Sequence, residues 1–377
     1  FFSEDCIDSY DIYFSKNLSG CSNCFGCINL RNKKYYIFNE PHIKEEYEKK
    51  IKEFRLDSYA AIREIKDKVY AFWQTVPHKF MCERHNVDVS GDYVYESKNA
   101  YAMYMARYIE NGKFCQFITT APVKDVYDYT EWGWGAQRIL DCITVGLQTD
   151  NIKYSSGIWD SCMNVEYGMY NVSCSNNFGC VNLRKKQYCI LNKQYSKEEF
   201  EKLRAKIIQD LENNPYIDSK GRVFKYGEFM PYDLTPYDYN ESTADWYFPR
   251  TKEETLEGGW RYHKQAQSPY KPTMKTEDIP DSINNVKDDI IKQVLECIDC
   301  NGVFRIIKPE LELLRRFGLP LPRKCPNCRY KERMTRINPA RLWTRSCAKC
   351  GKEIQTSYAP NRLEIIYCAQ CYQAEFV

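Results

Sequence analysis

The sequence predicts a mainly β fold, a parallel β-solenoid-like repeat with duplicated strand-helix caps, followed by two small metal-binding modules. Three observations carry this prediction. A segment of 29 residues occurs twice, with an offset of 153 residues. Turn-forming residues recur at a regular spacing between the two copies. Cys-x-x-Cys pairs gather at the C-terminal end, where paired cysteines are typical of metal-folded modules.

The composition sets the class of protein. The chain has 377 residues, which is enough for two or three domains and a substantial core. Hydrophobic residues make up 43% and charged residues 28%, which is typical of a globular chain and not of a disordered one. No run of about 18 apolar residues occurs, so we expect no transmembrane helix and no membrane partner. Because the chain starts at Phe1 without an initiator Met and without a signal-peptide pattern, we expect a fragment or a processed chain.

The first predicted unit, residues 1–80, holds the end of a truncated solenoid, a first cap unit and helices. Its cap unit begins CSNCFGCINLR at residue 21, and the chain repeats it from residue 174 with 18 of 29 positions identical. Identity at that level indicates two copies of one structural unit. In each copy a β-prone stretch follows the FGC motif and precedes a helix. Ser196 and Glu199 have the spacing of a capping box, which predicts where the second helix starts.

The second unit, residues 81–207, is predicted to be a β-solenoid that ends in the second cap unit. Short strands between evenly spaced polar corners favour parallel rungs, with about 25 residues per coil if each spacing is half a turn. The alternative is a meandering antiparallel sheet, which we disfavour because hairpin signals such as Asn-Gly are rare. The corners are predicted at Asn99, Gly112, Asp125, Asn151, Asn164 and Asn176, with spacings of 13, 13, 26, 13 and 12 residues.

The cysteines of the first half allow two interpretations. Cys21, Cys24 and Cys27 have the spacing of a ferredoxin-type cluster, but the second copy has Asn177 in place of Cys24. We therefore expect a column of small buried side chains. Cys82-x-x-His85 is half of a metal site without a second half, so we expect these two residues to be structural as well. Beyond these cysteines, residues 208–285 are rich in Pro-Tyr and Trp and should form an irregular aromatic segment that wraps over the solenoid.

The C-terminal cysteines give the strongest functional signal. Four thiolates per site are the closed ligand set of structural zinc, so we predict two Zn²⁺ ions. An odd total of 19 cysteines argues against a secreted disulfide scaffold and favours a cytoplasmic location. An interleaved pairing of the cysteine pairs is the alternative. The predicted sites are Cys297, Cys300, Cys325 and Cys328 in residues 286–340, and Cys347, Cys350, Cys368 and Cys371 in residues 341–377.

These segments resemble known zinc-binding families. Residues 297–333 are similar to the probable zinc-ribbon, treble-clef-like family in the Cys-x-x-Cys knuckle, Phe304 and the helix from Glu310. Residues 347–371 are similar to small CxxC…CxxC zinc ribbons. Over nearly its whole length the chain also resembles uncharacterised Cys- and Tyr-rich bacterial zinc-ribbon proteins of candidate-phylum lineages. The resemblance implies zinc-ribbon/treble-clef modules and no particular activity.

Charge gives the hypothesis for a partner. Residues 315–345 contain ten Lys or Arg and a single acidic residue, Glu332, on a chain of net charge +3. Basic zinc modules with interleaved aromatics often bind phosphate backbones. The alternative is a solvated basic helix packed against the acidic solenoid; the oligomeric state is not predicted. We predict a non-enzymatic scaffold that binds RNA, DNA or a ribonucleoprotein such as the ribosome through Arg329, Lys331, Arg333, Arg336, Arg341 and Arg345.

The alternative class of function is an enzyme with its site on the solenoid face, as in carbohydrate-active β-helices. Such enzymes need clustered carboxylates. The same spacing of acidic residues arises from polar turns, so the scaffold is favoured and no catalytic residue is predicted. The carboxylates in question are Asp125, Asp128, Glu131, Asp141 and Asp160.

Overall fold

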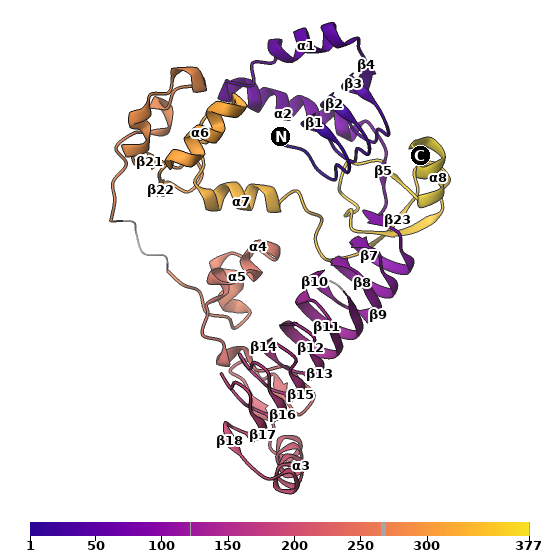
Figure 1. Cartoon of the computed structure of the whole chain (residues 1–377), viewed down its shortest axis with the longest axis vertical. Coiled ribbons are helices and arrows are strands. Elements are labelled where there is room, and N and C mark those ends of the chain that lie inside the picture. Colours follow the sequence, from indigo (N-terminus) through magenta and orange to yellow (C-terminus); the bar gives the residue numbers. More distant parts are fainter. Residues whose placement is uncertain (121, 265–268, 377) are drawn as a thin grey trace.

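A computed structural model gives the structure of residues 1–120, 122–264 and 269–376 (Figure 1). Two parallel β ladders dominate it, a short one near the N-terminus and a long one that runs diagonally in the view. Helix α2 (Tyr59–Gln74) lies between them in the sequence. The predicted strand-rich fold with parallel sheets is confirmed. None of the described helices is long and apolar enough to cross a membrane.

The short ladder consists of three parallel strands and a final antiparallel return. Its last strand leads into helix α1, whose residue Tyr47 is buried against the ladder's aromatic core. Phe25 and Phe54 stack there with their ring centroids 4.2 Å apart. The elements are β1 (Tyr10–Tyr13), β2 (Ser22–Phe25), β3 (Lys34–Ile37), β4 (Glu40–Pro41) and α1 (Lys44–Glu53).

The long ladder is parallel up to its last pair of strands, β17 and β18, which is antiparallel. The prediction of parallel pairing is therefore correct over this segment. Its elements are β6 (Glu83–Arg84), β7 (Val87–Tyr95), β8 (Lys98–Arg107), β9 (Ile109–Lys113), β10 (Gln116–Thr120), β11 (Val123–Gly133), β12 (Ala136–Gly146), β13 (Asp150–Lys153), β14 (Ser156–Ile158), β15 (Met163–Glu166), β16 (Ser175–Phe178), β17 (Gln187–Ile190) and β18 (Lys193–Gln194).

The register of the long ladder corrects the predicted length of a coil. Val87 pairs with Lys98, a step of 11 residues, and Val123 pairs with Ala136, a step of 13. Ile109 pairs with Val123, a step of 14. One spacing of the corner residues is thus a whole rung and not half of one. The expectation of about 25 residues per coil is wrong.

A left-handed backbone conformation at every third residue produces this short rung. From Asn17 to Asn32, the residues with positive φ stand at every third position. Many of the residues that follow a corner point inward, as Cys21, Cys24 and Cys27 show by their complete burial. Asn, Asp and Gly tolerate positive φ better than other residues do, which explains why turn-type residues recur along the chain.

The predicted corner residues form a column of hydrogen-bonded side chains. Asn151 Nδ2 donates to Asn164 Oδ1 at 2.8 Å, and neighbouring corners are linked in the same way. The prediction of Gly112 is wrong by one residue, because the corner is Asn111 and Gly112 points inward. Arg138 occupies the corner that the spacing left empty. The other predicted corners all have positive φ: Asn99, Asp125, Asn151, Asn164 and Asn176.

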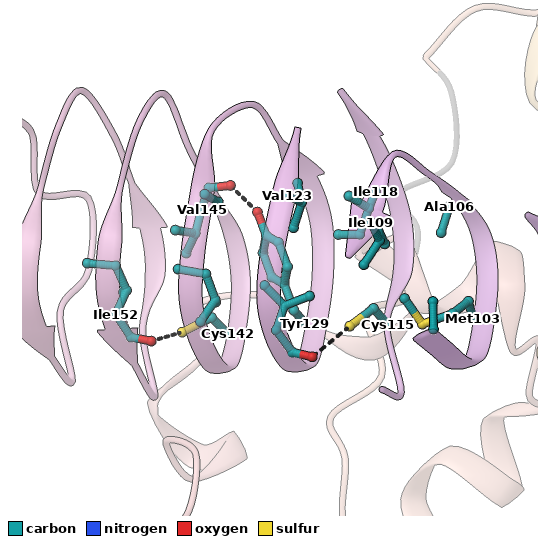
Figure 2. Packing of buried hydrophobic residues seen from close by; sticks show 14 of the residues in the cluster. Met103, Ala106, Ile109, Cys115, Ile118, Val123, Tyr129, Cys142, Val145 and Ile152 are labelled. Carbon is teal, nitrogen blue, oxygen red and sulfur yellow. Dashed lines mark hydrogen bonds between the residues drawn. The ribbon is translucent and has the colours of Figure 1, made fainter. Parts of the chain in front are cut away.

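Apolar side chains and cysteines fill the interior of the long ladder (Figure 2). Tyr129 is the largest fully buried residue, and its hydroxyl donates to the Val145 carbonyl. Cys142 Sγ lies 3.2 Å from the Leu140 carbonyl and 3.5 Å from that of Ile152. The predicted column of small buried side chains is confirmed for these buried cysteines: Cys21, Cys24, Cys27, Cys115, Cys142, Cys162, Cys174, Cys180 and Cys189.

The two cap units have the same structure. Elements β2, β3, β4 and α1 recur as β16, β17, β18 and α3 (Lys197–Asn213), and every first residue is shifted by 153. The predicted capping box at Ser196 is present. In the first copy the Asn39 amide accepts from the Ile28 N–H at 2.9 Å and donates to its carbonyl at 3.0 Å. Asn192 does the same to Val181. Each side-chain amide thus makes the two hydrogen bonds that the backbone of a further rung would make.

The segment after α3 returns along the long ladder (Figure 1). The Gly227 N–H donates to the Tyr167 hydroxyl at 3.0 Å, and the Tyr247 ring lies 4.1 Å from that of Phe117. These contacts agree with an aromatic segment that covers one side of the ladder. Its elements are β19 (Tyr216–Ile217), β20 (Val223–Phe224), α4 (Ala244–Tyr247) and α5 (Lys252–Glu257).

The corner constraint is testable at Asn164. We expect Asn164→Val to lower the free energy of unfolding by about 1–2 kcal/mol, because a β-branched residue is strained at positive φ. Asn164→Gly relieves that strain and loses only exposed side-chain hydrogen bonds, so it should cost less than about 1 kcal/mol. Urea unfolding followed by circular dichroism measures both values. Equal destabilisation by the two substitutions would contradict the constraint.

Candidate metal centres

The first centre is built from a hairpin turn and a helix start. Strands β21 (Leu295–Glu296) and β22 (Val303–Phe304) pair antiparallel, and their turn carries Cys297 and Cys300. Helix α6 (Lys308–Phe317) follows, and α7 (Pro326–Met334) begins at Cys325, with Cys328 in its first turn. The four Sγ atoms all lie within 4.8 Å of one another.

Backbone N–H groups favour the thiolate form of Cys297 in the first centre. The Cys297 carbonyl accepts from the N–H of Asn301, a residue with positive φ, which closes the knuckle. The Cys325 N–H donates to Cys297 Sγ at 3.2 Å. Burial by itself would raise the pKa of Cys297, but N–H donors from Cys325 and Cys300 outweigh it and lower the pKa to about 7. A thiolate is the form that binds metal.

The second centre repeats this layout with different residues. The hairpin of β23 (Trp343–Ser346) and β24 (Glu353–Thr356) carries Cys347 and Cys350 in its turn, and Gly351 there has positive φ. Cys368 precedes helix α8 (Ala369–Phe376), and Cys371 lies in its first turn. Again the four Sγ atoms lie within 4.8 Å of one another. The cysteines therefore group in the predicted pairing and not in the interleaved one.

The electrostatics of the second centre also match those of the first. The Cys368 N–H donates to Cys347 Sγ at 3.3 Å. Burial opposes ionisation of Cys347, but the N–H groups of Cys368 and Cys350 lower its pKa to about 6. Four sulfur ligands in a tight cluster are a donor set that fits Zn²⁺, and they leave no open coordination position for catalysis.

The second module is attached at the junction of the two ladders. Strand β25 (Ile366–Tyr367) pairs in parallel with β5 (His78–Lys79), and Thr356 Oγ1 donates to the Phe80 carbonyl at 2.6 Å. The buried Asp92 of the long ladder accepts from the Ser357 hydroxyl and from Asn338. Strand pairing and a buried carboxylate thus hold this module in place.

His78 lies in this junction and is almost fully buried. Its Nε2 lies 3.0 Å from the Trp73 carbonyl, an acceptor that requires a proton on this nitrogen. Burial, with the positive charge of Lys16, lowers the pKa of His78 to about 4. The imidazole is therefore neutral at physiological pH.

The predicted nucleic-acid residues serve contacts within the chain. Arg345 donates to two backbone carbonyls, while Arg333 and Arg341 lie over the rings of Tyr330 and Trp343. These contacts do not neutralise the three charges, but they direct the side chains to groups of the same chain, so the nucleic-acid hypothesis gains no support. The other three predicted residues form ion pairs: Arg329 with Glu310 at 2.8 Å, Lys331 with Asp245 at 2.8 Å, and Arg336 with Glu4 of the short ladder.

The carboxylates of the alternative enzyme hypothesis are corner residues. Burial and the neighbouring Asp128 raise the pKa of Asp141 to about 6, and burial also raises the pKa of Asp128. The set lies within the region of repeated corners, as expected for polar turns. All members have positive φ: Asp125, Asp128, Glu131, Asp141 and Asp160.

Cys82 and His85 do not come together as ligands. The Cys82 thiol donates to Asp5 at 3.4 Å, whereas His85 Nδ1 lies 2.8 Å from Glu96. The interpretation of Cys82-x-x-His85 as a structural pair therefore agrees with these contacts.

One further group of possible ligands was missed by the sequence analysis. Asp238, Glu241 and His263 have ligand atoms within 4.8 Å of one another. Two separate segments supply them, so no spacing motif could have revealed the group. Arg261 Nε donates to Asp238 at 2.9 Å and already neutralises part of this charge.

The buried His78 predicts a pH dependence. A histidine in the unfolded chain titrates near ~6.5, so between this value and about 4 the unfolded chain binds a proton that the folded chain does not. Stability should therefore fall as the pH drops from 7 to 4. We expect the native chain to lose up to about 3 kcal/mol more than His78→Gln over this range. Urea unfolding of both at several pH values measures the difference. Parallel pH profiles for the two chains would refute this.

Comparison with known proteins adds no assignment. No family model, no curated protein and no solved structure matches this chain at the significance required.

Proposed function

We propose that this protein is a non-enzymatic scaffold whose C-terminal end folds around two structural Zn²⁺ ions. The observation that supports it is the pair of four-cysteine clusters, each with its Sγ atoms within 4.8 Å of one another. Closed four-thiolate sites stabilise small modules and supply no reactive metal position. In each module a hairpin knuckle precedes a ligand pair at a helix start, so we assign both to the treble-clef type.

The scaffold itself we infer to be two short β-solenoids. Parallel pairing, rungs of 11 to 14 residues and a corner of positive φ at every third residue support this assignment. A solenoid needs its ends capped, and the duplicated strand-helix units lie where caps are required. The carboxylates of the rival enzyme hypothesis have positive φ, which a polar corner explains without a catalytic role.

The metals would hold different parts of the scaffold. The first module packs around α6 and α7, with Cys297, Cys325 and Phe304 in one apolar cluster. The second module reaches both ladders, because the Ser357 hydroxyl donates to Asp92 of the long ladder and the Tyr372 hydroxyl accepts from Asn17 of the short ladder at 2.5 Å. Loss of the second ion should therefore loosen the junction between the ladders as well as the module.

The zinc content tests the proposal directly. Chain purified under reducing conditions should contain two zinc ions by elemental analysis. Cys300→Ser and Cys350→Ser should each lower the content to one, because each removes a ligand from a different cluster. Cys6→Ser is the matched control, since this free cysteine belongs to neither cluster, and it should retain two. Less than one zinc per native chain would sink the proposal.

Amide hydrogen exchange tests which elements of the structure each zinc ion stabilises. Cys350→Ser should speed amide exchange in β23 to α8 and also in β5, which pairs with β25. Cys300→Ser should speed exchange in α6 and α7 and leave β5 protected. The centre of the long ladder, β11 to β13, should be unchanged in both variants. Equal effects of the two substitutions on β5 would show that the modules do not act separately.

A further inference from the structure

A cavity of about 330 Å³ lies where the long ladder, α4 and the end of α7 meet. Its floor is formed by Tyr104, Met105 and Phe117 of the ladder. The short helix α4 and residues 334–340 form its walls. Figure 1 shows α4 between α7 and the β10 end of the ladder. This place is separate from both cysteine clusters.

Aromatic side chains of the long ladder and of residues 246–248 line the cavity. The Tyr247 ring lies 4.1 Å from the Phe117 ring, and its hydroxyl is hydrogen-bonded to Tyr330. Next to it, Trp246 and Phe248 remain 41% and 43% exposed. Large aromatic side chains that line a concave surface yet stay half exposed are typical of a site that a ligand completes.

The charged groups of the cavity are already paired with each other. Lys331 Nζ lies 2.8 Å from Asp245 Oδ2, which forms a neutral ion pair at the rim. The Thr335 hydroxyl donates to the Glu332 carbonyl, and Asn338 bonds to the second metal module. Among the described lining residues, no unpaired charge therefore points at a ligand, and a charged ligand would lose its hydration without compensation.

We propose that this cavity binds a small, uncharged, flat aromatic molecule. The volume lies at the lower end of the range for ligand sites, about 300–1,000 Å³, which suits one or two fused rings. Ring faces and edges of the lining aromatics favour another ring over an aliphatic chain. The inference goes beyond the zinc scaffold, because it assigns a ligand class to a surface that contains no cysteine of either cluster.

The test uses indole as the uncharged two-ring probe and the full zinc-loaded chain. Saturation-transfer NMR and a titration should show saturable binding of indole to the native chain. Ala340→Phe places a ring inside the cavity and should weaken binding at least tenfold. Met105→Trp fills the cavity from the opposite wall and should do the same. The zinc content of both variants should remain two, which shows that the modules are folded.

Phe114→Ala is the matched control. Phe114 is the corner residue that precedes Phe117 and also has positive φ, but its side chain is 45% exposed and does not line the cavity. Its removal should leave the affinity for indole within twofold of native. Indole-3-acetate, which adds a carboxylate, should bind at least tenfold more weakly than indole.

Three outcomes would overturn the proposal. The first is an absence of saturable indole binding to the native chain. The second is equal affinity of native and Ala340→Phe chains, which would place the probe elsewhere. The third is a native dimer in size-exclusion chromatography that Ala340→Phe and Met105→Trp convert to a monomer, since the cavity would then be covered by a second copy.

Discussion

Both ladders depend on the left-handed conformation that recurs at every third residue. Each non-glycine corner costs roughly 1–2 kcal/mol of local strain, so the rung forms only where parallel hydrogen bonds to both neighbouring rungs offset it. Because a corner recurs at every third residue, each side of a rung is three residues long, and the interior of the ladder is narrow. Cysteine, alanine, serine and valine fit that interior, and a buried thiol can donate to a backbone carbonyl, as Cys142 does. The high cysteine content of the first half therefore follows from backbone geometry and not from metal or disulfide chemistry.

The sequence predicted what has a local or repeated signature. The duplicated units, the capping box at Ser196 and the grouping of eight cysteines into two clusters were all visible as motifs. The length of a rung was not, because asparagine and aspartate dominate only one column of corners in the long ladder and are mixed with other residues in the rest. Other corners are aromatic, such as Tyr35 and Phe117, and an aromatic residue gives no turn signal. The period of three was thus hidden by side chains that pack outside the ladder.

The binding partners of the basic stretch, residues 315–345, could not be predicted for a different reason. Its partners come from distant parts of the chain: Glu4 from the short ladder and Asp245 from α4. A charge run shows no sign of whether its counter-ions lie in solvent, in a nucleic acid or in the same molecule. Arg336 also lies over the rings of Tyr70 and Trp73, which gives it a packing role in α2 beyond its charge. Only the tertiary structure identifies these contacts.

The side-chain amides of Asn39 and Asn192 affect how copies of this protein can associate with one another. A parallel ladder presents backbone donors and acceptors at its last rung, and such an edge is a template for cross-β growth from one molecule to the next. The side-chain amide of Asn39 bonds to the N–H and carbonyl of Ile28, and that of Asn192 bonds to the same groups of Val181. These backbone groups are then no longer available to a strand of another molecule. The helix that follows then covers the same end. Fibril elongation from these two ends is therefore blocked by one residue and one helix in each copy of the repeated unit.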